Sequence, residues 1–177
     1  MDVLREIDEL QRRLYELKKQ VAGRAHTEEL PDGDLTVLIA RVGEERVAFL
    51  ARSLDEVVPM ARLTPMPESP SWVAGVLNLR GRMVPVIDVL ARSRRGARRQ
   101  EVEDLIVICR VDERPVGLVV QEIVDVRIVD RRRLEPPPQD VPFAPYLLGL
   151  LKMEGAPGLL LSIRRLAATS DLPEEDG

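Results

Sequence analysis

The chain has few of the residues from which catalytic and metal sites are most often built. It contains one cysteine and one histidine in 177 residues, and aromatic residues make up 3% of the sequence. One cysteine forms no disulfide within the chain, and one histidine leaves little material for a Ser-His-Asp triad or a histidine-based metal site. Scarce aromatic side chains also argue against a protein that stacks the bases of RNA or single-stranded DNA. We therefore expect no bound metal, no cofactor and no nucleic acid partner.

Long hydrophobic runs are also missing, and none of the apolar stretches is long enough to cross a bilayer. The first residues lack the cationic start and apolar stretch of an export signal. The sequence thus predicts a cytoplasmic protein without direct membrane insertion. Hydrophobic residues nevertheless make up 45% of the chain, and the net charge is only −4, so one domain-sized, mainly aliphatic core is expected.

The two rare residues lie in unremarkable surroundings. Cys109 is inside an apolar strand-like run, where a small buried thiol is expected. His26 lies in a polar stretch with Gly23, Pro31 and Gly33, which is typical of a linker rather than of a phospho-accepting or metal-binding site. The sequence has no phosphate-binding loop, Rossmann glycine pattern or cysteine pair, and its carboxylates are not grouped with such residues. We expect no enzymatic activity.

The N-terminal segment has the most regular apolar pattern, with steps that alternate between four and three residues. This pattern predicts an amphipathic helix with a heptad seam, suited in part to a parallel two-stranded coil. Arg13 would face Lys18 of a second copy, a like-charge contact that weakens the case for a homodimer. Three alternatives remain open: the helix docks on its own β domain, dimerises, or binds a partner's coil. The seam residues are Val3, Ile7, Leu10, Leu14, Leu17 and Val21.

From Leu35 onwards the apolar residues form short strand-like runs separated by glycine, proline and charged turns. This change of period marks a domain boundary and predicts an all-β domain of small barrels, not a parallel sheet with crossover helices. The expected organisation is a helix over residues 1–22, a linker over 23–33, a β domain over 34–168 and a disordered acidic tail over 169–177.

The most informative segment joins two apolar strand-like runs through Asn78-Leu79-Arg80-Gly81. Gly81 supplies backbone freedom for a tight turn that presents one arginine, an arrangement better suited to docking than to chemistry. Pro70 and Trp72 precede the turn, and the run from Val84 to Asp88 follows it. Together these residues resemble the signature of the CheW family, adaptors that couple chemoreceptors to a histidine kinase.

The resemblance extends over residues 34–168, because the later strand-like runs at 105–108, 115–126 and 159–163 follow in the family's order. It implies two SH3-like five-stranded β-barrels that pack around a shared aliphatic core, with a binding groove in the interval between them. The N-terminal helix is an addition to this fold.

The resemblance also implies a function in chemotaxis-type two-component signal transduction. The chain would be a non-catalytic scaffold between the helical tip of a methyl-accepting chemoreceptor and the regulatory domain of a CheA-like histidine kinase, recruited to membrane-associated receptor arrays. Asn78 would hold the turn, and Asp55 carries less weight than its neighbours. The predicted partner-binding residues are Leu54, Glu56, Asn78, Leu79, Arg80 and Gly81.

Two other functions remain open. Gln121 and Ser162 stand where the family often has acidic residues, which favours a specialised member of a non-flagellar chemosensory pathway that binds only one partner. The arginine-rich segments 92–99 and 131–133 allow a nucleic-acid-binding small barrel, although solvated loops are the expected explanation for charge clusters between strands.

Overall fold

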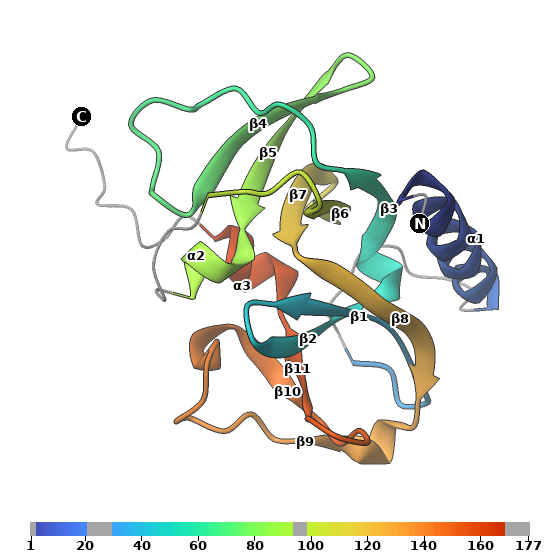
Figure 1. Cartoon of the computed structure of the whole chain (residues 1–177). Coiled ribbons are helices and arrows are strands. Elements are labelled where there is room, and N and C mark those ends of the chain that lie inside the picture. The colour runs from blue at the N-terminus through green and yellow to red at the C-terminus, as the bar shows by residue number, and fades with distance from the viewer. Residues whose placement is uncertain (1–2, 21–29, 94–98, 169–177) are drawn as a thin grey trace.

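The computed structural model describes residues 3–20, 30–93 and 99–168, and its strands form two sheets (Figure 1). The first sheet has the order β8-β1-β2-β11-β10-β9, and the second has the order β3-β6-β7-β5-β4. The strands of the first sheet are β1 (Leu35–Val42), β2 (Glu45–Leu50), β8 (Glu122–Val129), β9 (Leu134–Glu135), β10 (Leu147–Leu151) and β11 (Gly158–Leu161). Those of the second sheet are β3 (Leu54–Pro59), β4 (Val73–Leu79), β5 (Arg82–Asp88), β6 (Leu105–Val111) and β7 (Arg114–Val120).

The helical elements are short apart from the first. They are α1 (Val3–Gln20), α2 (Val89–Arg92), α3 (Ile163–Ala167) and the 3-10 turns η1 (Ala51–Ser53), η2 (Arg131–Arg133) and η3 (Ala144–Tyr146). The all-β fold with two small subdomains and an N-terminal helix is confirmed. The second sheet has the expected five strands, and the first gains a sixth because the two residues of β9 pair with β10.

The hydrophobic residues pack in three layers. One layer lies inside the first subdomain and contains Val37 and Ile39, while another lies inside the second and contains Val84 and Val86. The middle layer lies between the sheets and contains Leu38 and other residues of both subdomains. Strand β1 therefore has buried side chains on both faces, which explains why its sequence is a nearly continuous apolar run.

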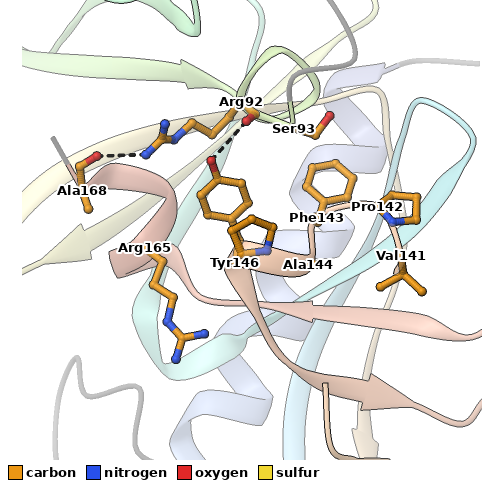
Figure 2. A pocket seen from close by; sticks show the side chains of 10 residues that line it. Arg92, Ser93, Val141, Pro142, Phe143, Ala144, Tyr146, Arg165 and Ala168 are labelled. Carbon is orange, nitrogen blue, oxygen red and sulfur yellow. Dashed lines mark hydrogen bonds between the residues drawn. The ribbon is translucent and has the colours of Figure 1, made fainter. Parts of the chain in front are cut away.

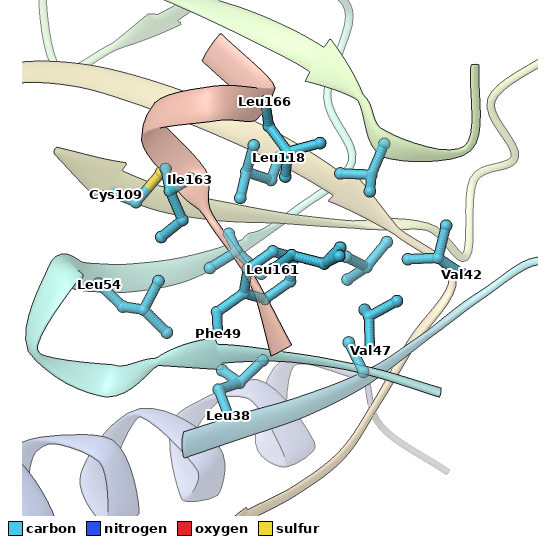
Figure 3. Packing of buried hydrophobic residues seen from close by; sticks show 14 of the residues in the cluster. Leu38, Val42, Val47, Phe49, Leu54, Cys109, Leu118, Leu161, Ile163 and Leu166 are labelled. Carbon is cyan, nitrogen blue, oxygen red and sulfur yellow. The ribbon is translucent and has the colours of Figure 1, made fainter. Parts of the chain in front are cut away.

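The middle layer joins the two subdomains into one core (Figure 3). Phe49 of β2 and Leu161 of β11 meet Leu54 of β3 and Leu118 of β7 in this layer, and all four side chains are at most 1% exposed. Cys109 is also buried there, as predicted, and its thiol donates a hydrogen bond to the carbonyl of Val116 at 3.2 Å. The shared aliphatic core expected between the two subdomains is thus present.

Helix α1 packs on the β domain of the same chain. Ile7 and Leu14 are 4% and 2% exposed within the middle layer, and Leu10 and Leu17 pack against it while partly buried. Of the three predicted arrangements, the structure thus has the one in which the helix docks on its own β domain. The heptad seam is not free to pair with a second copy while α1 is docked. Val21, His26 and the predicted tail lie outside the described residues.

In residues 3–20, 30–93 and 99–168, we find no helix with both the length and the apolar character that crossing a bilayer requires.

Candidate functional site

The predicted site centres on the turn between β4 and β5. Leu79 pairs with Arg82 across the hairpin, so Arg80 and Gly81 alone form the loop. Their φ angles are 49° and 81°, and two consecutive left-handed residues define a type I′ turn, whose twist matches that of the flanking strands. Asn78 Oδ1 accepts a hydrogen bond from the Gly81 N–H at 3.0 Å. This hydrogen bond holds the turn, the role that the sequence predicts for Asn78.

Arg80 at the tip of this hairpin forms an ion pair with Glu56 of β3. Both terminal nitrogens of Arg80 donate to the Glu56 carboxylate, and the longer contact, Nη1 to Oε2, is 3.3 Å. The hydrogen bonds and the charge of Glu56 raise the pKa of the Arg80 guanidinium. The Arg80 side chain is 71% exposed while that of Glu56 is 19% exposed, so Glu56 is the fixed member that orients a solvent-facing arginine.

A second ion pair lies beside the first. Arg110 Nε donates to Asp55 Oδ2 at 2.7 Å, and this hydrogen bond, together with the charge of Asp55, raises the pKa of Arg110. The two pairs line a hollow of about 350 Å³ together with Leu79, Arg82 and Pro115. We call this feature the charged hollow. It is formed by the tip of the β4–β5 hairpin, the edge strand β3 and the adjoining ends of β6 and β7.

The hairpin tip differs on its two faces. Arg82 and Val84 face the charged hollow, whereas Met83, between them in sequence, is on the opposite face of the strand and is 61% exposed. Within the hollow, the oriented Arg80 lies beside the apolar residues Leu79 and Pro115, and such a combination is found at many reversible protein interfaces. The residues that the structure describes include no group of three or more His, Cys, Asp or Glu side chains placed to hold a metal ion.

One predicted contact residue is wrong. The Leu54 side chain is 0% exposed and lies in the middle layer of the core, so it offers no surface to a partner (Figure 3). A register shift between Leu54 and Glu56 interrupts the pairing of β3 with β6, and strand alternation therefore misplaces the side chains around it. Asp55, which the sequence ranked lower, contributes directly to the charged hollow.

Sequence reasoning missed Arg82 and Arg110. Each is a charged residue at or next to one end of a mainly apolar strand, and this is the signal by which they could have been found. Their neighbours in the hollow are distant in sequence, since Arg110 and its partner Asp55 are 55 residues apart.

A second pocket, of about 480 Å³, lies where α2 of the second subdomain meets η3 and α3 of the first (Figure 2). The guanidinium carbon of Arg92 is 4.1 Å and 5.0 Å from the ring centres of Trp72 and Tyr146. Its Nε and Nη2 donate to the carbonyls of Leu166 and Ala168 at 3.1 Å and 3.0 Å. Arg92 therefore connects the subdomains.

This position corrects one expectation for the arginine-rich segment 92–99. Arg92 is 4% exposed and is not part of a solvated loop, whereas residues 94–98 lie outside the described part of the chain. In the second segment, Arg132 donates to Asp130 at 2.8 Å, and this pairing lowers the pKa of Asp130 to about 2. The local ion pair agrees with the solvated-loop interpretation of that segment.

The two departures from the family pattern have structural roles. Ser162 caps α3, because its hydroxyl accepts a hydrogen bond from the Arg165 N–H at 3.1 Å. The side-chain carbonyl of Gln121 accepts one from the Gly43 N–H, which holds the turn between β1 and β2.

Comparison with known proteins gives one consistent result. The model of the CheW-like domain matches residues 36–171. The chain is 33% identical to the chemotaxis protein CheW of Rhizobium meliloti over 109 residues, which is 62% of this chain and 70% of that protein. It is 31% identical to the protein PilI of Pseudomonas aeruginosa over 123 residues, which is 64% of this chain and 65% of PilI.

The fold has an equally clear counterpart among solved structures. The scaffolding protein TtCheW from Thermoanaerobacter tengcongensis superimposes with a TM-score of 0.72 at 25% sequence identity, over 83% of this chain and 96% of that one. The two SH3-like subdomains are thus shared, while α1 precedes the matched residues 36–171. With a domain match over most of its length and a two-subdomain fold in agreement, the chain belongs to the CheW-like domain family.

Proposed function

We propose that this scaffold of chemotaxis-type signalling joins the helical tip of a chemoreceptor to the regulatory domain of a CheA-like histidine kinase, without catalysing a reaction. The observation that carries the proposal is the position of Arg80, held by Glu56 at the tip of a rigid hairpin beside the charged hollow. The names of the relatives support the same role, since one is a chemotaxis protein and another a scaffolding protein. In this role the chain reaches membrane-associated arrays through its receptor partner.

The ion pair suits reversible docking. The Arg80 side chain is 71% exposed while it pairs with Glu56, so its guanidinium is open to a carboxylate on a partner helix. The turn meanwhile keeps the arginine in one place, which provides specificity and reduces the conformational entropy lost on binding. Apolar side chains that line the charged hollow, such as Leu79 and Pro115, would supply the affinity. The kinase contact is expected to be mainly apolar.

The test is to measure binding of a receptor-tip fragment and of a kinase regulatory fragment separately, by calorimetry. Arg80→Glu reverses the charge and repels Glu56, and we expect it to weaken receptor binding by about tenfold or more, which is about 1.4 kcal/mol. Its thermal midpoint should stay within about 5 °C of the wild type, because the side chain that is changed is 71% exposed. The double variant Glu56→Arg, Arg80→Glu restores an ion pair between positions 56 and 80. It still presents a negative charge to the partner at position 80, where the wild type presents a positive one.

Arg132→Glu is the matched control, since Arg132 is also an exposed arginine in an ion pair, with Asp130, but lies outside the charged hollow. Receptor binding that Arg80→Glu leaves unchanged would contradict the proposed contact. A fall in the thermal midpoint as large as that of a core substitution would show that Arg80 is structural.

A second candidate is a member of another chemosensory pathway that retains only one of the two partners. The likeness to PilI, whose name differs from that of the chemotaxis proteins, favours it, as does the structural use of Gln121 and Ser162. The same two titrations separate the candidates, because this one predicts binding to a single fragment.

A further inference from the structure

Helix α1 lies across the junction between the two sheets. It contacts β3, which is an edge strand of the second sheet, and β8, which is an edge strand of the first (Figure 1). It also precedes the residues that match the family model, 36–171. The helix is therefore an addition to the family domain that covers one edge of each subdomain.

Two polar contacts fix α1 on these edges. Gln11 Oε1 accepts a hydrogen bond from the Val57 N–H of β3 at 3.1 Å, and so satisfies a backbone donor that an edge strand leaves unpaired. Arg13 Nη1 lies 2.7 Å from Asp125 Oδ1 of β8. Asp125 also faces Arg127 of its own strand, at 2.9 Å from Nε. Gln11 thus binds the second subdomain, and Arg13 binds the first.

Apolar anchors of α1 have the spacing of a helix in a helix-binding groove. Ile7 and Leu14, two turns apart, are buried in the middle layer, and Leu10 and Leu17 pack against it. Amphipathic helices that bind in apolar grooves of other proteins are recognised through anchors spaced three and four residues apart in this way. A different helix with the same pattern has the shape to occupy the same place.

The surface under α1 continues into the candidate site. Val57, which binds Gln11, follows Glu56, which binds Arg80. The place that α1 occupies on β3 therefore adjoins the charged hollow.

We propose that the surface of β3 and β8 beneath α1 is a binding surface for an amphipathic helix of another protein, and that α1 is its intramolecular competitor. The incoming helix carries apolar side chains at heptad spacing and a basic residue that faces Asp125, as α1 does. The proposal deepens the proposed function and rests on it in one respect, since the receptor tip is the helix expected to compete. The apparent affinity for the incoming helix is proportional to the fraction of molecules in which α1 is displaced.

The first experiment compares full-length variants in calorimetric titration with the receptor-tip fragment. Gln11→Ala combined with Arg13→Glu removes the contacts with Val57 and Asp125 and leaves the sequence of the β domain unaltered. We expect the double variant to bind about fivefold more tightly than the wild type, because more molecules expose the surface. Arg12→Glu is the matched control, since it makes the same charge change at an exposed position of α1, and it should leave the affinity unchanged.

The second experiment does not depend on the receptor. A synthetic peptide of residues 3–20 is titrated into the full-length double variant and into the wild type. We expect the peptide to bind the double variant measurably more tightly than the wild type, and a peptide with Arg13→Glu to bind less well than the natural one. Binding of the peptide while the receptor fragment binds neither protein would support the helix surface and contradict the proposed function.

Two results would overturn the inference. One is equal peptide binding by the double variant and the wild type together with equal receptor affinities. The other is a double variant that sediments as a dimer through exchange of α1, which would make a second copy of this chain the occupant instead of another protein.

Discussion

At the scale of single residues, two arginines of this chain have opposite environments. Arg80 is 71% exposed and pairs with a carboxylate. Arg92 is 4% exposed, contacts two aromatic rings and donates to backbone carbonyls. A guanidinium tolerates the buried environment of Arg92 because it is planar and weakly hydrated. It can stack on aromatic rings while its N–H groups donate hydrogen bonds in the plane of the group. The first arginine is available to a partner, and the second holds the protein together.

Arg92→Lys should therefore destabilise the fold although the charge is kept. An ammonium group has no plane to stack on Trp72 and Tyr146, and it does not reproduce the paired bonds to Leu166 and Ala168. We expect a loss of about 2 kcal/mol in the free energy of unfolding, measured by denaturant titration. Arg164→Lys, at an exposed ion pair with Asp112, is the control and should cost less than about 1 kcal/mol. Equal stability of the two variants would contradict a structural role for Arg92.

The carboxyl of Asp130 should titrate far below its ordinary pKa. Hydrogen bonds from the side chain and backbone of Arg132 lower its pKa from 3.8 to about 2. Because the folded pKa is the lower one, Asp130 stabilises the fold above pH 3.8, and this contribution is lost as the pH falls from 3.8 through about 2.

Arg132→Gln tests the cause, with the pKa read from NMR titration of the carboxyl carbon. The pKa should rise towards 3.8 without reaching it, since the backbone N–H of residue 132 still donates to the carboxylate. A titration identical to that of the wild type would show that the side chain is not responsible.

At the scale of elements, the β4–β5 hairpin depends on two glycines for different reasons. Gly81 has φ of 81° and open space where a Cβ would lie, with no atom within 4 Å. Gly75 has φ of 145°, and a Cβ there would lie 2.7 Å from the Thr64 carbonyl oxygen. Gly75 thus permits the close approach by which Thr64 bridges Val76 of the edge strand β4. Gly81 supplies only the turn conformation.

Substitution of the two glycines by alanine should separate strain from steric clash. Gly81→Ala is expected to cost about 1 kcal/mol, the strain of a left-handed residue. Gly75→Ala adds a clash with backbone and should cost about 3 kcal/mol or more. Thermal unfolding of both variants measures the difference, and a Gly81→Ala variant as unstable as Gly75→Ala would contradict this account of the turn.

Helix α1 shows which part of an element can be predicted from sequence. The heptad pattern correctly predicted the helix and its buried face. It did not predict what covers that face, because docking and coiled-coil pairing need the same pattern. The decision comes from contacts between distant residues, such as Gln11 with Val57, 46 positions apart.

The candidate site was predictable to a similar extent. The turn, Asn78 and Arg80 followed from local sequence, and the family resemblance supplied Glu56. The register shift next to Leu54 hid the orientation of β3, and Arg110 reaches the hollow only through the pairing of β6 with β3. Local periodicity predicts neither the register shift in β3 nor the pairing of β6 with β3.

At the scale of the whole molecule, the middle core layer makes the two subdomains one folding unit. Its residues come from both sheets and from α1, so neither subdomain keeps its buried surface if the other unfolds. The bonds of Arg92 to the end of α3 add a second connection. We therefore expect one cooperative unfolding transition for the β domain.

Leu160→Ala tests this cooperativity from a position remote from the reporter. Leu160 is 0% exposed inside the first subdomain, whereas Trp72, the single tryptophan, lies beside Arg92 of α2. The cavity should cost about 2–5 kcal/mol. If the subdomains unfold together, the denaturation midpoint from Trp72 fluorescence falls by the same amount as the midpoint from far-UV circular dichroism. Val124→Ala, at a side chain 46% exposed on β8, should move neither midpoint appreciably. A fluorescence midpoint that stays at the wild-type value while the dichroism midpoint falls would mean that the subdomains unfold separately, and that the shared layer does not couple them.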